Sequence, residues 1–170
     1  MSNLIIFVGP SGSGKSMMAD YMQKKYGAVK IVSTTNRAMR PGEVDGRDYY
    51  FVSDMEFTDM TVRHEFLEYA QYSGNYYGTT KAEIDAKMTS AEWIVNVMEI
   101  SGAREIKNLV PGCVLIYMDV PIVTLMHRMN DRGDAFESIV KRVENYVKTH
   151  EDENERYCDF VIHNIGTVEE

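Results

Sequence analysis

The first residues that could carry out chemistry form a glycine-rich segment near the N-terminus. The pattern G-x-x-x-x-G-K-[ST] runs from Gly9 to Ser16. Glycines in such a segment let backbone N–H groups converge on a phosphate, and the N-terminus of a following helix adds positive potential there. Lys15 can then reach terminal phosphates, and the Ser16 hydroxyl can ligate Mg2+. We therefore predict a phosphate-binding loop; the alternative is a glycine-rich turn without a ligand.

The flanking elements must hold this loop in place. Leu4 to Val8 is an apolar run typical of a buried strand. Met18, Met22 and Tyr26 are spaced four apart and predict one face of a helix. Strand, glycine-rich loop and helix is the setting in which this pattern binds phosphate.

Strands alternate with helices along the rest of the chain. Further strands are predicted over residues 29–32, 65–72, 93–98, 114–118 and 159–162. Capping boxes at residues 53–56 and 80–83 predict short helices. Three more helices are predicted from the spacing of apolar residues. One begins after Ser101 and has Ile106 and Leu109 at apolar positions, and the next begins after Pro121 and has Val123, Leu125, Met126 and Met129. The third lies within residues 136–150 and has Ile139, Val143 and Val147. The order predicts an α/β fold with a mostly parallel sheet covered on both faces.

Composition limits the class of protein. The 170 residues predict one domain, and 44% hydrophobic with 26% charged residues is ordinary for a globular chain. No apolar run has the length of a membrane span and no signal-peptide pattern is present, so we expect a cytoplasmic protein without a membrane partner. We expect the two cysteines, Cys113 and Cys158, to be reduced. We expect the four histidines to be structural or exposed; they are His64, His127, His150 and His163.

The charge is unevenly spread. Of the net charge of −8, −6 lies from Val143 to the end, where eight residues are acidic and two are basic. This balance argues against a nucleic-acid partner. A site for an anionic substrate then needs local clusters of arginine. Arg37 and Arg40 lie three apart in a turn-rich segment and could grip one phosphate, although solvated loop charges fit the spacing equally well.

Several motifs, in order, resemble the guanylate kinases. They lie at residues 9–16, 37–49, 66–70, 74–78, 102–103, 132–133 and 157–164. The most specific is R-x-x-R-P-G-E-V-D-G-x-D-Y-x-F-V, which begins at Arg37. The resemblance covers nearly the whole chain. It implies a P-loop kinase fold and transfer of a phosphoryl group from ATP, with Mg2+, to GMP or dGMP. A monomer or homodimer is expected.

The resemblance also implies three regions. The core would comprise residues 1–32, 89–127 and 150–170, with a small monophosphate-binding insertion at residues 33–88 and a helical lid at residues 128–149. Lys15, Arg37, Arg132 and Arg142 would be catalytic, and Arg128 could join them.

The binding residues follow by match to the family. The ATP phosphates would be held by Gly9, Ser11, Gly12, Ser13, Gly14, Lys15, Ser16 and Met17, with Ser16 on the metal and Asn164 near the adenine. GMP would be held by Ser33, Arg37, Arg40, Tyr49, Glu68, Tyr77, Gly78, Thr79 and Glu99. Without the family, Glu68 reads as a solvated strand carboxylate. With it, Glu68 would accept the N1–H and 2-amino donors of guanine, a pair that adenine lacks.

The sequence departs from the family in two places. Val97 stands at the first of two expected carboxylates and Glu99 at the second, unless the strand shifts so that Asn96 takes the first role. The lid is one residue short after Arg132. Alternative functions are a ribose 1,5-bisphosphate kinase, which needs no Glu68, a monophosphate kinase with altered base preference, and a non-catalytic guanylate kinase-like module, which typically lacks the lysine at position 15.

Overall fold

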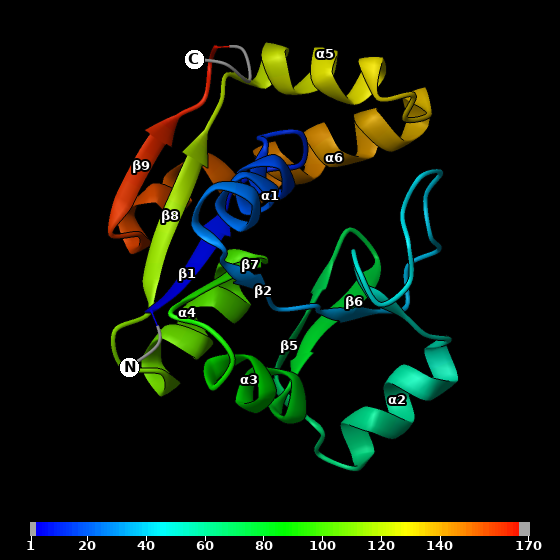
Figure 1. Cartoon of the computed structure of the whole chain (residues 1–170). Coiled ribbons are helices and arrows are strands. Elements are labelled where there is room, and N and C mark those ends of the chain that lie inside the picture. Colours follow the sequence, from blue (N-terminus) through cyan, green and yellow to red (C-terminus); the bar gives the residue numbers. More distant parts are fainter. Residues whose placement is uncertain (1–2, 167–170) are drawn as a thin grey trace.

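A parallel sheet forms the centre of the molecule. The computed structural model describes residues 3–166. Five strands are ordered β2-β7-β1-β8-β9, and every neighbouring pair is parallel (Figure 1). They are β1 (Asn3–Val8), β2 (Val29–Lys30), β7 (Trp93–Val97), β8 (Val114–Asp119) and β9 (Phe160–His163). The predicted α/β class and parallel core sheet are confirmed.

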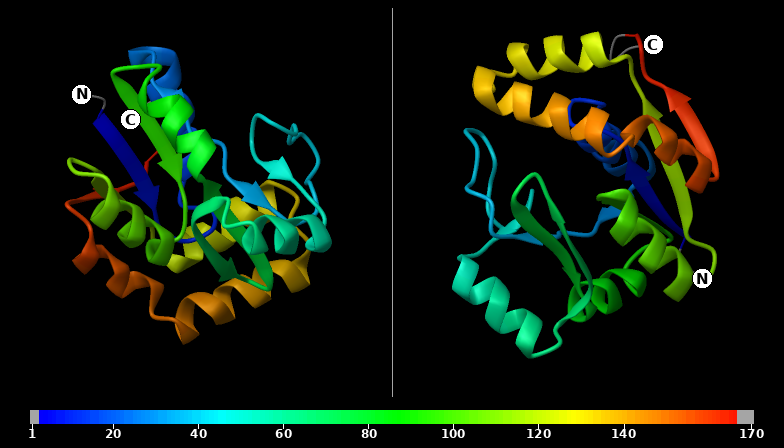
Figure 2. Two further views of the ribbon diagram at one scale, coloured as in Figure 1. Left: turned by 90° about the horizontal axis from the view of Figure 1, so that it is seen from below. Right: turned by 180° about the vertical axis from the view of Figure 1, so that it is seen from behind.

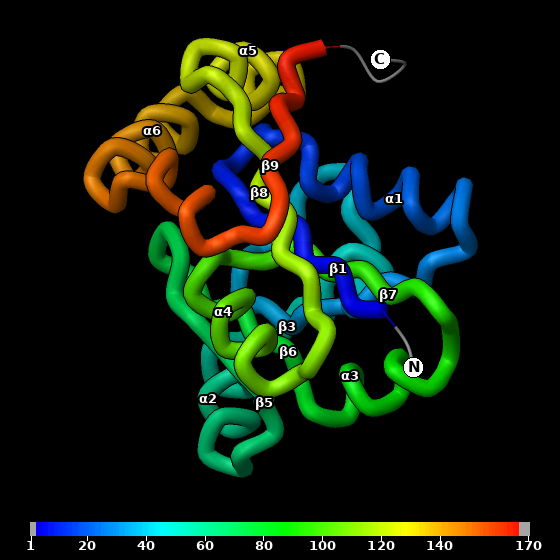
Figure 3. Tube along the Cα trace, turned by 90° about the vertical axis from the view of Figure 1, so that its left-hand side faces the viewer, coloured from blue at the N-terminus to red at the C-terminus, as the bar shows by residue number. Residues whose placement is uncertain are grey.

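Helices cover both faces of this sheet because its strands are apolar on both sides. Leu4 and Ile6 of β1 pack in a cluster with α4 (Ile100–Leu109), whereas Phe7 packs in a second cluster with α1 (Lys15–Tyr26). Figure 3 shows these two helices on opposite sides of β1 and β8. Because β1 side chains alternate between the two faces of the sheet, β1 packs against both helices. This packing fixes the position of α1, and of the phosphate loop before it, relative to the sheet.

A smaller sheet lies beside the core. Its order is β4-β3-β6-β5, with β3 and β4 parallel and the other pairs antiparallel. The elements of this part are β3 (Thr34–Thr35), β4 (Tyr50–Phe51), α2 (Asp54–Val62), β5 (Phe66–Tyr72), β6 (Asn75–Thr80) and α3 (Lys81–Met88). They fill the predicted insertion. Figure 2 shows the small sheet and α2 set apart from the main sheet.

The C-terminal part adds two helices and a short 3-10 helix. These are α5 (Ile122–Asp131), α6 (Phe136–Lys148) and η1 (Glu151–Tyr157). They lie on the opposite side of the molecule from α2 (Figure 1). α5 continues through Arg128, so the predicted boundary between core and lid falls inside a helix. The outer ends of the predicted core, residues 1–2 and 167–170, lie outside the described residues. Within residues 3–166, no helix is both long and apolar enough to cross a membrane.

Five apolar positions on the predicted helix faces are exposed, so they do not belong to the core. Tyr26, Leu109, Val123, Met126 and Val147 are 53%, 58%, 60%, 40% and 59% exposed. All but Met126 lie in the first or last turn of their helix.

The second predicted capping box is only half formed. Thr80 caps α3 by accepting the N–H of Glu83. The Glu83 carboxylate instead accepts the N–H of Val32 at 3.0 Å, where the chain leaves the main sheet. At Ser53 both reciprocal bonds are present, so that prediction is confirmed.

The packing of β1 generates a stability prediction. Ile6 is fully buried, so Ile6→Ala should lower the free energy of unfolding by about 3 kcal/mol because it removes contacts and leaves a cavity. Urea denaturation followed by circular dichroism measures this loss. Val123→Ala, at an exposed helix position, should change it by less than about 0.5 kcal/mol. Equal losses in the two variants would contradict the assigned burial.

Candidate active site

The glycine-rich loop joins β1 to α1 in a conformation that needs glycine. Gly9, Gly12 and Gly14 have φ angles of 140°, 86° and 93°, a region that side chains rarely adopt. A Cβ at Gly9 would also lie 2.8 Å from the carbonyl oxygen of Met118. The backbone N–H groups at the start of α1 therefore follow a turn that brings them together, as anion binding requires.

Lys15 lies at the centre of this loop. Its Nζ donates to the carbonyl oxygens of Gly9 and Pro10 at 2.6 and 2.8 Å. Burial lowers the pKa of Lys15, and the charges of Glu99 and Glu151 oppose that effect. Burial raises the pKa of Glu99 to about 8, although the Lys15 charge counteracts it. A cation and a carboxylate thus share the poorly solvated end of the site.

One cavity of about 470 Å3 connects the loop with the small sheet. Its lining from the loop and α1 is Ser11, Gly12, Gly14, Lys15, Ser16 and Met17. Its lining from the predicted insertion includes Ser33, Arg37, Arg40, Tyr49, Glu68, Tyr77 and Gly78. Val97, Glu99, Gly102, Arg128 and Arg132 also line it. The structure therefore brings most of the predicted site residues to one space.

The arginine pair is held by an acidic residue that the sequence reasoning did not assign. Glu43 accepts two hydrogen bonds from Arg37, at 2.8 and 3.0 Å, and one from the backbone N–H of Arg40 at 2.7 Å. The Arg37 guanidinium also lies 5.4 Å from the ring centre of Tyr49, whose ring is 5.9 Å from that of Tyr77. The only sequence indication of this role was the position of Glu43 inside the arginine motif.

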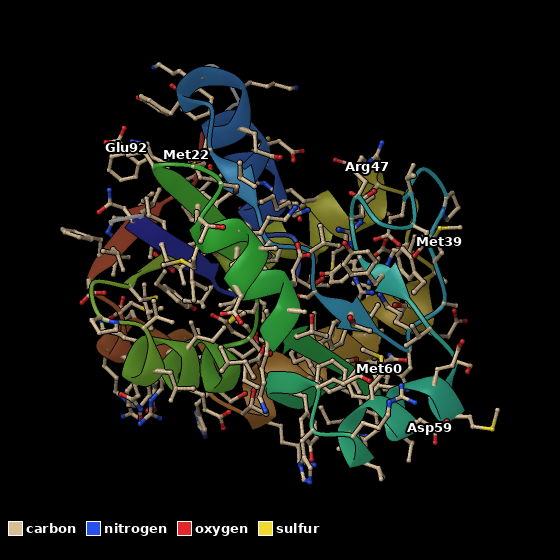
Figure 4. All side chains as sticks on the ribbon, turned by 60° about the horizontal axis from the view of Figure 1, so that its bottom comes forward. Met22, Met39, Arg47, Asp59, Met60 and Glu92 are labelled. Carbon is tan, nitrogen blue, oxygen red and sulfur yellow. The ribbon has the colours of Figure 1, made fainter. Side chains whose placement is uncertain are left out.

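Positive charge is concentrated around Arg40. Burial lowers the pKa of Arg40, and the nearby guanidinium groups of Arg37, Arg142 and Arg132 lower it further. Like charges gathered in this way favour a bound anion. The figure with all side chains places Met39 at the outer edge of the same loop, away from the cavity (Figure 4).

Glu68 lies at the other end of the cavity and is only 6% exposed. Burial raises the pKa of Glu68 to about 7, against hydrogen bonds from the side chain and backbone of Thr79. The carboxylate packs against Gly102 in the first turn of α4, where a Cβ would overlap Oε2. The Ser33 and Thr79 hydroxyl oxygens are 3.5 Å apart beside it. The predicted base-side residues thus form one polar group.

The predicted lid residues face the phosphate loop. Asp134 accepts from Arg132 at 2.5 and 2.9 Å and from Arg142 at 2.6 Å. Arg142 also donates to the Ser11 hydroxyl at 3.0 Å. Asp134 was not predicted; it follows directly after the Arg-Gly motif, and only the fold shows that it pairs both arginines.

Asn164 closes the loop from the opposite side. Its Nδ2 donates to the Ser13 carbonyl oxygen at 2.9 Å, and its backbone carbonyl oxygen accepts from Arg128 at 2.9 Å. The other terminal nitrogen of Arg128 is buried and has no hydrogen-bond partner within residues 3–166. Arg128 therefore keeps an unused donor beside the cavity.

The two departures from the expected carboxylates have different surroundings. Val97 packs in the apolar cluster with Phe7, and β7 pairs with β1 in unbroken register up to this pair. The side-chain oxygen of Asn96 accepts the N–H of Val97 at 2.7 Å, so its amino group, and not an oxygen, is left over. Glu99, which follows β7 and is the N-cap residue of α4, is thus the carboxylate that reaches the cavity here.

The described residues contain no preformed metal-binding site made of several acidic, histidine or cysteine side chains. Within residues 3–166, no three His, Cys, Asp or Glu side chains are grouped to hold a metal ion. Mg2+ usually keeps several waters and binds phosphates together with one or two protein oxygens. The Ser16 hydroxyl and the Glu99 carboxylate, which line the same cavity, fit that kind of site.

A glycine-rich loop after the first strand of a parallel sheet, facing a cluster of arginines, defines a P-loop phosphotransferase. The family model for guanylate kinase matches residues 1–170. The guanylate kinase of Gloeobacter violaceus is 38% identical over 146 residues, which covers 84% of this chain and 71% of that protein. The guanylate kinase of Streptococcus thermophilus is 39% identical over 145 residues, with coverage of 83% and 69%.

Solved structures agree with this result. The crystal structure of guanylate kinase from Anaplasma phagocytophilum matches with a TM-score of 0.72 and 25% identity, covering 99% of this chain and 78% of that chain. The chain belongs to the guanylate kinase family and is a nucleotide-binding kinase.

The raised pKa of Glu68 generates a pH prediction. An unfolded glutamate releases its proton near pH 4.5, whereas folded Glu68 holds it to about pH 7. The folded state binds more protons between these values, so stability falls as pH rises through this window. Between pH 5 and 7.5 the free energy of unfolding should fall by about 2 kcal/mol more in the wild-type chain than in Glu68→Gln, which cannot titrate.

Urea denaturation of both proteins at the two pH values tests this. Glu92→Gln, at an exposed position just before β7, is the matched control and should follow the wild-type chain. A pH-independent difference between wild type and Glu68→Gln would contradict the buried, protonated state of Glu68.

Proposed function

We propose that the protein transfers the γ-phosphoryl group of ATP to GMP, and to dGMP, giving ADP and GDP or dGDP. One observation carries this proposal: a single cavity has the phosphate loop at one end and the buried Glu68 at the other, with the arginine cluster beside it. Membership of the guanylate kinase family supports it.

The donor side is the loop from Gly9 to Met17. Its backbone N–H groups would bind the ATP phosphates, with Lys15 on the terminal ones and Asn164 beside the adenine. The Ser16 hydroxyl and the Glu99 carboxylate would hold Mg2+. Mg2+ would neutralise charge on the β- and γ-phosphates.

The acceptor side divides into a phosphate end and a base end. Arg37, Arg40, Tyr49 and Tyr77 surround the first and would grip the GMP phosphate through charge-assisted hydrogen bonds. Glu68 would accept N1–H and the 2-amino group of guanine, and Ser33, Gly78 and Thr79 would complete this end. Glu99, whose charge acts on Lys15, would contact GMP from the loop side. Two N–H donors favour the ionised carboxylate, so guanine would lower the raised pKa of Glu68.

The arginines would stabilise the transferring group. The phosphoryl transition state spreads negative charge over its oxygens, and preorganised cations stabilise that charge without forming a covalent intermediate. Arg132 and Arg142 are already oriented by Asp134, and Arg128 has an unused buried donor. These groups, with Lys15 and Arg37, form the proposed catalytic set. Their approach would also exclude water, which would otherwise compete with GMP.

The alternatives fit the site less well. A ribose 1,5-bisphosphate kinase would have no use for Glu68, buried against Gly102. A non-catalytic module would not need the intact loop or Lys15. Val97 is the one observation that favours a second candidate, a monophosphate kinase with altered base preference, because an apolar side chain replaces a carboxylate in the cavity. We expect small-molecule partners only, a cytoplasmic location, and a monomer or homodimer.

A panel of monophosphates tests the proposed reaction. ADP release with Mg-ATP should be rapid with GMP and dGMP and at the ATP-only background with AMP, CMP, UMP and ribose 1,5-bisphosphate. Lys15→Met, which removes the loop cation, should reduce GMP turnover at least 1000-fold (about 4 kcal/mol) and serves as the control for contaminating kinases. Turnover of GMP no faster than ATP alone would reject the proposal.

Base selection by Glu68 can be measured separately. Glu68→Ala should lower kcat/KM for GMP on the order of 100-fold, because two guanine donors lose their acceptor, and should leave AMP turnover and KM for ATP within threefold. Glu105→Gln, an exposed carboxylate whose charge affects Glu68, is the control and should behave as wild type. Equal losses for GMP and ATP would argue against a role in reading the base.

A further inference from the structure

The chain crosses from the main sheet to the small sheet at Val32. On one side of it, the N–H of Ile31 donates to the Val95 carbonyl oxygen of β7 at 2.8 Å. On the other side, the Ser33 carbonyl oxygen accepts the N–H of Tyr50 in β4 at 2.9 Å. Val32 lies between these two bonds and is only 7% exposed. A buried backbone N–H needs a partner, and for Val32 this partner comes from a helix.

The partner is Glu83 of α3. Its Oε1 accepts the N–H of Val32 at 3.0 Å, and its Oε2 accepts from the Tyr50 hydroxyl at 3.4 Å. Lys87, one turn further along α3, lies 3.7 Å from the same carboxylate and balances part of its charge. The Glu83 side chain is 11% exposed, so water has little access to these bonds. One carboxylate therefore holds both the crossing and β4, an edge strand of the small sheet.

The helix that carries Glu83 is itself anchored on the core. Ile84, the next residue, is 6% exposed and belongs to the apolar cluster that contains Ile31 and Ile94. The N–H of Glu83 donates to the Thr80 hydroxyl at 3.2 Å, which caps the first turn of α3. The chain also returns to the main sheet through α3, since β7 is the next element. The Glu83 carboxylate therefore joins the outgoing segment to the returning one where both meet the core.

The two residues that Glu83 holds are chain neighbours of residues in the main cavity. Ser33 follows Val32, Tyr49 precedes Tyr50, and both Ser33 and Tyr49 line the cavity. Within residues 3–166, Glu83 is not part of that lining. Because consecutive Cα atoms stay about 3.8 Å apart, a shift of Val32 or Tyr50 would carry its neighbour with it. Glu83 can therefore act on the cavity without touching a ligand in it.

We propose that Glu83 is a positioning residue: by holding Val32 and Tyr50, it sets where Ser33 and Tyr49 lie relative to the phosphate loop. The proposal rests on the proposed function, which assigns Ser33 and Tyr49 to the monophosphate. Without the carboxylate, the buried N–H of Val32 would lose its acceptor, so the crossing would move to regain a partner. Phosphoryl transfer is sensitive to such shifts, because the acceptor must be aligned with the donor phosphate.

Glu83→Ala removes the acceptor and keeps the helix. We expect KM for the monophosphate to rise about tenfold, because Ser33 and Tyr49 are displaced, while KM for ATP stays within about twofold of the wild-type value. A merely structural glutamate would instead lower the folded fraction, which reduces kcat and leaves both KM values unchanged. Asp85→Ala is the matched control: it lies on the same helix at an exposed position and should keep wild-type kinetics.

Two conservative variants identify the bond that matters. Glu83→Gln keeps an oxygen that can accept the N–H of Val32, so its KM for the monophosphate should stay within about threefold of the wild-type value. If Glu83→Ala does not fold, Glu83→Asp replaces it: the shorter side chain cannot reach both partners, and KM for the monophosphate should rise about fivefold. An unchanged KM for the monophosphate, an equal rise for ATP, or a Glu83→Gln variant as impaired as Glu83→Ala would overturn the proposal.

These ratios are measured with whichever monophosphate the wild-type chain turns over. If it turns over none, the Kd of GMP from calorimetry replaces KM in the same comparison. The panel of monophosphates therefore tests the proposed reaction, and the Glu83 variants test the positioning role independently of that result.

Discussion

Repulsion among guanidinium groups is the constraint on which the arrangement of the site depends. The four groups belong to Arg37, Arg40, Arg132 and Arg142. Burial lowers the pKa of Arg40, and the proximity of the other three groups lowers it further. Two carboxylates hold them in place: Glu43 accepts from Arg37 and from the backbone of Arg40, and Asp134 accepts from Arg132 and Arg142. Each carboxylate orients its arginines and leaves net positive charge toward the cavity. An anion with several phosphates is the complementary ligand.

Burial of carboxylates is a second constraint, and a different interaction compensates it at each position. Glu99 shares its surroundings with Lys15, so a cation compensates it. Glu151 takes a hydrogen bond from Asn145. Glu68 is bonded by Thr79, but burial outweighs this and raises its pKa to about 7. Of the three, Glu68 has the most to gain from a ligand that brings N–H donors, which is consistent with a base-reading role.

Close packing decides how these charges reach one another. Gly102 has no Cβ, and the room left there is what lets the Glu68 carboxylate lie against α4. In the same way Gly14 leaves room for Asn164, whose amide bonds to the loop. Positions that look like simple helix or loop glycines in the sequence are therefore points where elements far apart in the chain come into contact.

The sequence by itself determined the phosphate loop, the alternation of strands and helices and the family, because these depend on local patterns: glycine spacing, apolar periodicity and short motifs. It did not determine which apolar residues at helix ends are buried: Leu109 and Val147, in the last turns of α4 and α6, are exposed. Nor did it show that Arg142 donates to Ser11 or that Glu83 accepts the N–H of Val32. Those contacts join segments distant in the chain, and only the tertiary structure decides which side chains share a buried, weakly solvated space.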